Sequence, residues 1–284
     1  MWTVFYLNFR GYMSKKSSFE SIINSFDQKP NVIGVGESHY RHNKKVNLPG
    51  YQLYTRNRTE KSQGGIATLV LENDSKDCLK VTEGNQLNEF IITRHSEFKI
   101  PINVIHVYGQ QQSRTPVNIL SDHSNEIVEE IVKIEAKDEH VVWLGDFNCS
   151  LGSTIVKGNS DRVSHVGKLL LDFLESTEKY VLLNGSSKEI GGPFTRVEPT
   201  DPNDDTKKSI LDLIIVSRDL LKYVDTFEID NRRKYTPSHA LKKNTLTYPD
   251  HLALILTFKD IPKKFSEPKK TPAPVIWNTN KKSG

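Results

Sequence analysis

VVWLGDFNC, residues 141–149, is the segment that decides the fold. Its first four residues are apolar, a pattern typical of a short strand that is buried on both faces. Gly145, Asp146 and Asn148 follow. In an extended chain, side chains two residues apart point the same way, so Asp146 and Asn148 are expected to share one side. An acid and an amide at a strand end often only bind nearby backbone, so their meaning depends on the rest of the chain.

Length and composition are those of a globular protein. The chain has 284 residues, 36% hydrophobic and 26% charged, which suits one large α/β domain or two small ones. Its two cysteines, Cys78 and Cys149, imply no disulfide framework and favour a reducing nuclear or cytoplasmic location. No run of about eighteen apolar residues predicts a membrane span. The apolar N-terminus has no preceding basic segment and therefore predicts a strand rather than a signal peptide.

The positive charge is concentrated at one end of the chain. The net charge is +4, but residues 262–284 contain six lysines and one glutamate, so the rest of the chain carries −1. Binding of a polyanion by the folded body must therefore depend on local patches. The Lys- and Pro-rich composition predicts a flexible linker or tail over residues 261–284 and a folded domain over residues 1–260.

Short apolar strands outnumber helices in the predicted fold. Helical periodicity is found at 17–26, 117–136 and 164–175. Strands are expected at 2–7, 31–39, 49–54, 64–71, 88–93, 100–107, 141–144, 180–183, 191–195, 209–216, 226–229 and 251–258. Because the helices lie between strands, the pattern predicts an α/β protein with sheets sandwiched by helices.

Polar residues follow many of these strands, where α/β folds gather their sites. These residues are Asn8, Glu37, Tyr108, Asp146, Asn148, Asp250 and His251, and Asp212 lies inside an apolar strand. A carboxylate such as Glu37 can bind Mg²⁺, and an acid–imidazole pair that includes His251 can deprotonate a water. Taken singly, Glu37 also fits a solvated charge and His251 a structural histidine. Together the residues fit hydrolysis of a phosphodiester.

Seven short motifs strengthen this interpretation because they occur in the order of a known family. They are Leu7-Asn8, Val35-Gly-Glu-Ser-His39, Gly64-Gly-Ile-Ala67, Val107-Tyr-Gly109, Leu144-Gly-Asp-Phe-Asn148, Ser209-Ile-Leu-Asp212 and Asp250-His251. Over residues 3–258 the chain resembles the endonuclease/exonuclease/phosphatase superfamily. Within it, the chain is similar to the apurinic-endonuclease-like endonuclease domain of non-LTR (LINE-type) retrotransposons.

The resemblance implies a DNase I-like, four-layered α/β sandwich that uses Mg²⁺, with Mn²⁺ as an alternative. It implies that Glu37 is the metal-binding acid, with Asn8 and Asp250 beside it. It further implies that His251 is the general base or a phosphate ligand, oriented by Asp212.

The remaining roles implied by the resemblance concern the phosphate and the DNA. Asp146 would activate water or protonate the leaving oxygen, with Asn148 and Tyr108 on the phosphate. Three residues are expected to contact DNA, namely Thr195, Arg196 and Ser209.

Three positions depart from the family pattern. Gly36 stands where the family often has Gln, and Pro249 stands where it usually has Ser. Gln110-Gln111 replaces a Pro-rich turn or an Asn. Every metal and acid position is retained, which predicts an intact active site.

The predicted function is that of a Mg²⁺-dependent endonuclease that nicks one strand of double-stranded DNA. The 3′-hydroxyl left at the nick would prime reverse transcription in retrotransposition, and the tail would lead into a reverse transcriptase. One alternative is a phosphatase of the same superfamily acting on a small phosphoester, although Cys149 after Asn148 departs from the inositol phosphatase pattern. Another is a catalytically decayed DNA-binding remnant, against which the retained acids count.

Overall fold

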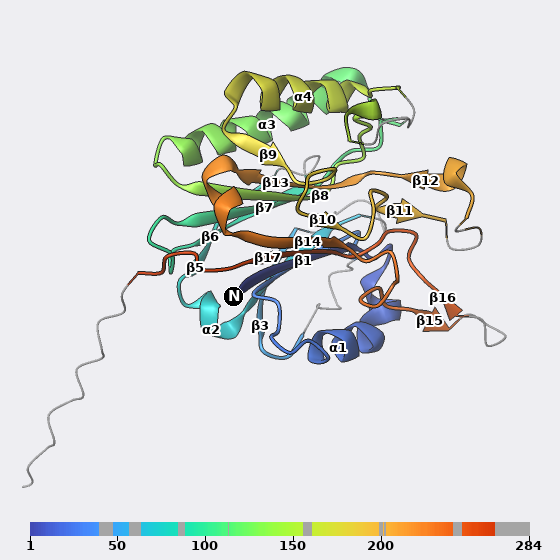
Figure 1. Ribbon diagram of the computed structural model, residues 1–284, viewed down its shortest axis with the longest axis horizontal. Coiled ribbons are helices and arrows are strands. Elements are labelled where there is room, and N and C mark those ends of the chain that lie inside the picture. Colours follow the sequence, from blue (N-terminus) through green and yellow to red (C-terminus); the bar gives the residue numbers. More distant parts are fainter. Residues whose placement is uncertain are drawn as a thin grey trace, which may run out of the picture.

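The computed structural model describes residues 1–39, 48–56, 64–84, 89–112, 114–155, 161–198, 201, 203–240 and 246–264. Over these residues, two large β-sheets pack face to face between helices (Figure 1). Helices α3 (Val117–Glu135) and α4 (His165–Thr177) cover the six-stranded sheet, and α1 (Lys16–Asn24) covers the seven-stranded sheet. The predicted four-layered α/β sandwich is therefore confirmed.

The seven-stranded sheet is centred on β1 (Trp2–Asn8). This strand pairs in parallel with β2 (Val32–Gly36) and antiparallel with β17 (Leu254–Phe258). The strand order is β10-β14-β17-β1-β2-β4-β3. The remaining bounds are β3 Tyr51–Arg56, β4 Ile66–Leu71, β10 Glu189–Ile190 and β14 Val224–Ile229. The first strand of the sequence, β1, and the last, β17, are therefore neighbours in the middle of the seven-stranded sheet.

The six-stranded sheet is centred on β7 (Ile102–Tyr108) and β8 (His140–Asp146), which are parallel. On its other side, β8 pairs antiparallel with β13 (Asp212–Ser217). The strand order is β5-β6-β7-β8-β13-β9. The outer bounds are β5 Cys78–Glu83, β6 Glu89–His95 and β9 Tyr180–Leu182. The opening segment of the sequence therefore forms a central strand, as its apolar residues predict.

Strand β1 shows why the central strands are apolar at nearly every position. Alternate side chains of a strand point to opposite faces. Val4 and Tyr6 join the core between the sheets, whereas Phe5 and Leu7 pack in the core under α1 with Phe19. Burial of such a side chain contributes roughly 1.5–3 kcal/mol. A strand buried on both faces therefore loses the polar alternation of a surface strand.

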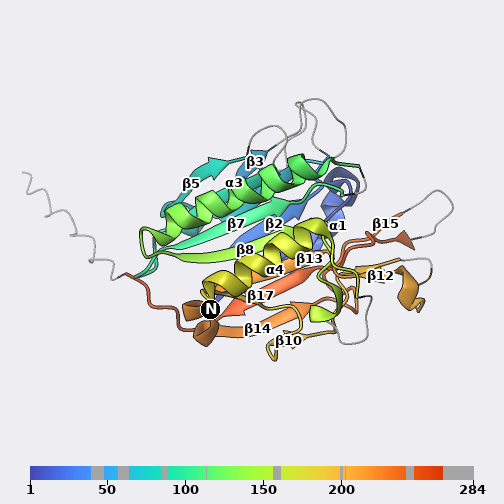
Figure 2. The same cartoon turned by 90° about the horizontal axis from the view of Figure 1, so that it is seen from above.

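Figure 2 shows α3 and α4 lying side by side above the strands of the six-stranded sheet. The buried residues of α3 include Leu120, Ile127 and Ile134, a spacing of seven that places them on one face. Helix α4 begins after Ser164, whose Oγ accepts a hydrogen bond from the Gly167 amide at 3.2 Å. The short helices are α2 (Glu72–Ser75) and the 3-10 turns Tyr12–Lys15, Gly152–Thr154, Asp205–Lys207 and Arg218–Tyr223.

The predicted strand over residues 191–195 is wrong. Gly191 and Gly192 have φ angles of +102° and +100°, and a Cβ on Gly191 would lie 2.0 Å from the carbonyl oxygen of Ile229. The chain turns there and then enters a hairpin of β11 (Arg196–Val197) and β12 (Lys208–Ser209). Glycine permits this turn because it lacks a Cβ.

Several short elements lie outside the predicted pattern. Strand β5 was not predicted, and β15 (His239–Ala240) and β16 (Leu246–Thr247) form a further antiparallel pair that was not predicted.

The expected domain boundary at residue 260 stays a prediction, since residues 265–284 lie outside the described residues. Just beyond that boundary, the amide of Lys264 donates to the carbonyl of Glu97 at 2.8 Å. Among the described residues, no helix combines the length and apolar character that a membrane crossing requires.

Candidate active site

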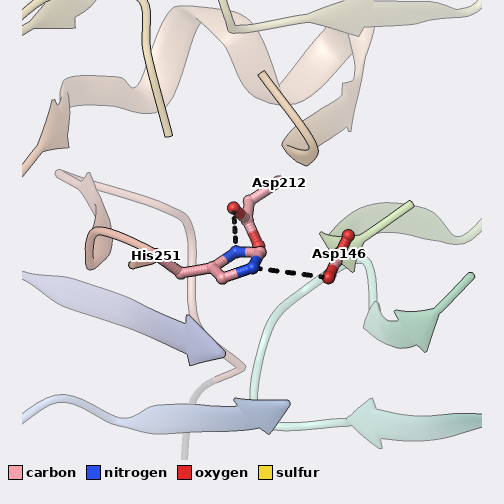
Figure 3. A group of neighbouring side chains, drawn as sticks. All are labelled: Asp146, Asp212 and His251. Carbon is pink, nitrogen blue, oxygen red and sulfur yellow. Dashed lines mark hydrogen bonds and ion pairs between the residues drawn. The ribbon is translucent and has the colours of Figure 1, made fainter. Parts of the chain in front are cut away.

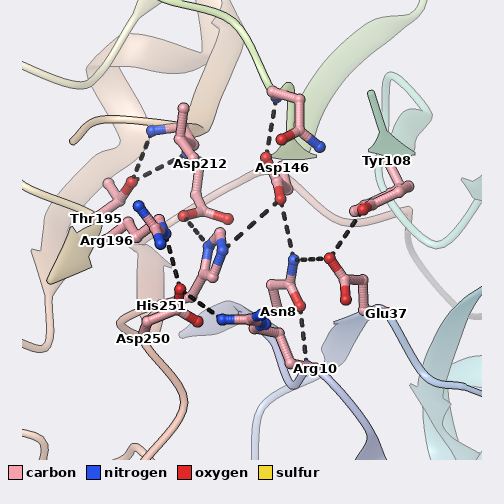
Figure 4. Close-up of polar contacts among 12 residues, drawn as sticks. Asn8, Arg10, Glu37, Tyr108, Asp146, Thr195, Arg196, Asp212, Asp250 and His251 are labelled. Atoms are coloured by element: carbon pink, nitrogen blue, oxygen red, sulfur yellow. Dashed lines mark hydrogen bonds and ion pairs between the residues drawn. The ribbon is translucent and has the colours of Figure 1, made fainter. Parts of the chain in front are cut away.

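Strand ends from both sheets meet at one edge of the sandwich (Figure 4). Asn8 ends β1, and Glu37 directly follows β2 beside it. In the other sheet, Asp146 at the end of β8 is paired with Tyr108 on one side and with Asp212 on the other. The register of the two sheets therefore gathers residues that are far apart in the sequence, as predicted for loop edges above packed sheets.

His251 forms an acid–imidazole pair with Asp212. Its Nδ1 lies 2.8 Å from Asp212 Oδ2, and its Nε2 lies 3.9 Å from Asp146 Oδ2 (Figure 3). The side chains of Asp212 and His251 are only 0% and 5% exposed. A buried charge is costly unless it is paired, so each member of this group needs the others.

Burial and the two acids shift the protonation of this group. Burial disfavours the imidazolium, but the charge and hydrogen bond of Asp212 outweigh it and raise the pKa of His251 above its ordinary value. Burial and the neighbouring Asp212 raise the pKa of Asp146 above its ordinary range. The arrangement therefore favours a protonated His251 and a carboxyl at Asp146 that takes up a proton more readily than an exposed acid.

Glu37 sits in a separate group of hydrogen-bond donors. The Tyr108 hydroxyl donates to Glu37 Oε1 at 2.8 Å, and His39 Nε2 lies 3.2 Å from Glu37 Oε2. The Asn8 amide lies 3.4 Å from Glu37 Oε1 and donates to Asp146 Oδ2 at 3.0 Å, so it joins the two groups. Although burial opposes ionisation, the bonds from His39, Tyr108 and Asn8 lower the pKa of Glu37 to about 2. Glu37 is therefore a carboxylate at neutral pH.

Asp250 is held by two arginines. Arg10 Nη1 and Arg196 Nε donate to the same oxygen, Oδ2, at 2.9 and 2.8 Å. Asp250 Oδ1 is buried and has no hydrogen-bond partner among the described residues. Burial opposes ionisation, but His251 and the arginines together lower the pKa of Asp250. One oxygen of this carboxylate thus remains available to a cation.

The other predicted residues lie around this centre. The Asn148 side chain donates to the Gly109 carbonyl at 2.8 Å, and the Asn148 backbone amide donates to Asp146 Oδ1 at 2.9 Å. Thr195 is fully buried, and its Oγ1 accepts from the Asp212 amide at 3.0 Å, so it positions Asp212. Ser209 Oγ is buried without a partner among the described residues. The DNA contacts predicted for Thr195 and Ser209 stay predictions.

Two groups of donors could hold a divalent metal. Ligand atoms of Asp146, Asp212 and His251 lie within 4.8 Å of one another, and Asp212 Oδ1 is a buried oxygen without a partner among the described residues. The second group is the predicted one around the ionised Glu37, whose oxygens suit a hard cation. The donors at this edge therefore fit a divalent metal, and carboxylate oxygens favour Mg²⁺ or Mn²⁺ over softer ions.

Arg10 and His39 are site residues that the sequence did not single out. Each lies two positions after a predicted residue, Asn8 or Glu37, and each has a positive φ, 44° and 52°. That spacing was the available signal.

The structure also explains the glycine at position 36. A Cβ there would lie 2.7 Å from the Tyr6 hydroxyl, so the site has no room for a longer side chain.

Comparison with known proteins gives matches in structure alone. No family model and no curated protein sequence matches the chain. An AP endonuclease from Archaeoglobus fulgidus is similar with a TM-score of 0.69 and 16% identity, covering 92% of this chain and 100% of that one. The endonuclease domain of TRAS1, a telomere-specific non-LTR retrotransposon, is similar with a TM-score of 0.58 and 15% identity, covering 91% and 98%. A 3′ phosphatase from Neisseria bound to a product DNA hairpin is similar with a TM-score of 0.65 and 15% identity, covering 91% and 100%.

These likenesses confirm the fold. Over most of its length the chain has the DNase I-like α/β fold of these endonuclease structures. At these sequence identities the comparison shows the fold alone, and the function follows from the residues of the site.

Proposed function

We propose that the protein is a metal-dependent hydrolase of phosphodiester bonds that nicks one strand of double-stranded DNA. The observation that carries this proposal is the buried His251–Asp212 pair at 2.8 Å with Asp146 on the second imidazole nitrogen at 3.9 Å. This arrangement places a protonated imidazole, that of His251, next to a carboxyl of raised pKa, that of Asp146. General acid–base catalysis of a phosphoryl transfer uses such groups.

The proposed chemistry divides between His251 and Asp146. With Nδ1 bound to Asp212, His251 directs its Nε2–H toward a phosphoryl oxygen and stabilises the charge there. Asp146 accepts the proton of the attacking water while the new P–O bond forms. The bond from phosphorus to the 3′-oxygen breaks, the phosphate stays on the 5′-end, and the 3′-oxygen leaves as a hydroxyl after taking up a proton from solvent water.

We assign the metal to the Glu37 group, with Asn8 and the free oxygen of Asp250 beside it. A bound Mg²⁺ would neutralise charge on the phosphoryl oxygens. Glu37 suits this role because its pKa of about 2 keeps it ionised. The donors from Tyr108 and His39 hold its carboxylate in place. The Asp146, Asp212 and His251 group is the alternative metal site, which metal titration of the variants below would separate.

The experiment that tests metal-dependent nicking uses supercoiled plasmid with Mg²⁺, with and without EDTA. We expect relaxed circles with Mg²⁺, none with EDTA, and recovery with Mn²⁺. Glu37→Gln should lose most nicking and weaken Mn²⁺ binding measured by electron paramagnetic resonance. Glu129→Gln, an exposed acid on α3, is the matched control. Nicking by Glu37→Gln at the wild-type rate would remove Glu37 from the metal site.

We also propose that the nicks prime reverse transcription in retrotransposition and that the tail leads into a reverse transcriptase, in a nuclear or cytoplasmic protein. Support comes from the structural likeness to the endonuclease domain of a telomere-specific non-LTR retrotransposon. A DNA polymerase should extend the nicks directly, because it requires a 3′-hydroxyl. Nicks that are extended only after phosphatase treatment would contradict the proposal. Release of phosphate from a small phosphoester without plasmid nicking would instead favour a phosphatase.

A further inference from the structure

A cavity of about 200 Å³ lies on the outer face of the six-stranded sheet, under helices α3 and α4. It borders Gly109 and Phe147, which lie next to Tyr108 and Asp146 in the chain, but no member of the catalytic group lines it. The cavity therefore lies across the sheet from the core between the two sheets and is a separate feature of the molecule.

The walls of this cavity are mostly aromatic and aliphatic, and the polar side chains among them are Gln110, His123, Ser124 and Asn125. Trp143 and Phe147 are 5.0 Å apart between ring centroids, and Phe173 of α4 meets Trp143 edge-on at 6.4 Å. Fifteen residues line the cavity, and none of them is Asp, Glu, Lys or Arg. Such a lining favours a neutral ligand, because a charge buried there would find no opposite charge.

Two buried nitrogens at the cavity have no hydrogen-bond partner within the described part of the chain. They are His123 Nδ1 and Trp143 Nε1, and both side chains line the cavity. His123 is only 5% exposed, and burial lowers its pKa to about 4, so the ring is neutral at pH 7. Because native proteins pair nearly all such groups, two unpaired nitrogens beside one cavity call for a partner inside it.

We propose that the cavity binds a small, neutral, planar aromatic molecule that carries a polar oxygen. The oxygen accepts from Trp143 Nε1, which can only donate, or pairs with His123 Nδ1, which donates or accepts according to its tautomer. The ring lies among Trp143, Phe147 and Phe173. An engineered apolar cavity of about 150 Å³ in another protein holds benzene, so this cavity has room for a substituted ring.

The first test is binding of phenol, followed by ligand-observed NMR. Val128 lines the cavity, whereas Val132 lies one turn along the same helix and is 54% exposed. Val128→Trp should fill the cavity and weaken phenol binding at least about tenfold, and Val132→Trp should leave it unchanged. Absence of saturable binding to the wild-type protein, or equal binding to both variants, would overturn the proposal.

The second test separates the polar contact from the shape of the cavity and uses variants that keep a ring. Toluene has the size of phenol but no hydroxyl. Replacement of one unpaired nitrogen, in His123→Phe or Trp143→Phe, should shift the ratio of the two Kd values about threefold to tenfold toward toluene. A ratio that stays constant in both variants, with circular dichroism showing a native fold, would contradict the polar contact. Neither test uses the nuclease assay, so failure here leaves the proposed function untouched.

Discussion

Two histidines in the space between the sheets, His251 and His106, are both buried but differ in charge, because His251 favours the protonated form and His106 stays neutral. His251 lies at the edge, with Asp212 at 2.8 Å and Asp146 at 3.9 Å. His106 on β7 lies deeper, with the hydroxyl of Thr68 at 3.1 Å and the ring of Tyr6 edge-on. Burial alone lowers the pKa of His106 to about 3, whereas Asp212 raises that of His251 above its ordinary value. The partner, rather than the depth, decides which buried histidine can do chemistry.

The largest expected effect comes from the pair at the edge. His251→Ala and Asp212→Asn should each lower the nicking rate about 10²–10⁴-fold, because each removes one half of a positioned acid–imidazole pair. The double variant should be little worse than either single one, since residues acting as a unit are non-additive. Steady-state nicking of plasmid measures all three.

The matched control is the other buried histidine. The double variant His106→Leu with Thr68→Val removes the neutral pair without touching the edge, and it should nick within about twofold of the wild-type rate. If the losses at His251 and Asp212 were simply additive, or if the control lost activity equally, the contrast between the two histidines would fail.

The next effect is on stability as pH falls. The folded-state pKa of His106, about 3, lies below the unfolded value, so below about pH 6.5 the unfolded chain binds a proton that the fold does not. Stability is therefore full above that pH and declines as the pH falls. Between pH 7 and 5, the wild-type protein should lose about 2 kcal/mol more than the double variant His106→Leu with Thr68→Val. Urea unfolding of both proteins at the two pH values measures this, and parallel losses would mean that His106 is not the neutral group described.

A smaller effect isolates the hydroxyl partner. Thr68→Val alone keeps the shape but leaves His106 Nδ1 unpaired in addition to Nε2, which already lacks a partner among the described residues. The free energy of unfolding at pH 7 should fall by about 1 to 3 kcal/mol. Adding His106→Leu should recover part of that loss, because removing both partners is cheaper than removing one. A double variant that is less stable than Thr68→Val by a full additive increment would show that the pair is not coupled.

The smallest effect on rate is expected where neither histidine is touched. Residues Glu198–Thr206 join β11 to β12 and can be replaced by a short Gly-Ser turn. Total nicking should change far less than in His251→Ala, but the distribution of nicks on a plasmid should change. Contacts in the minor groove of DNA read shape more than base identity, so a loop that contacts this groove should set a loose, shape-based choice of site. An identical nick map would remove this loop from the account of specificity.

Much of the fold follows from local sequence, because strands buried on both faces are short apolar runs. The segment 141–149 predicts both the central strand β8 and the polar residues at its end. The predicted strand over 191–195 failed for a physical reason: its two glycines serve a turn against the carbonyl of Ile229, a contact far away in the chain. Strand β5 was missed because its alternation carries little apolar signal in Cys-Leu-Lys-Val-Thr-Glu.

The sequence predicted which residues form the site better than it predicted the contacts between their side chains. The ordered motifs identify Glu37, Asp146, Asp212 and His251, which the structure brings to one edge. Which oxygen meets which nitrogen depends on the register between strands and on the approach of two sheets. The attachment of Asp250 to Arg10 is of this kind, because it joins residues 240 positions apart.

The pairing of β1 with β17 has a consequence for how the protein is made. The chain begins with the strand that ends in Asn8, yet that strand needs residues 254–258 beside it before its sheet is complete. His251 emerges from the ribosome only just before them. Synthesis runs from the N-terminus at about 5–20 residues per second, so β1 waits many seconds for its neighbour. In a growing chain, the group of side chains around His251 is therefore completed only after translation has passed residues 254–258.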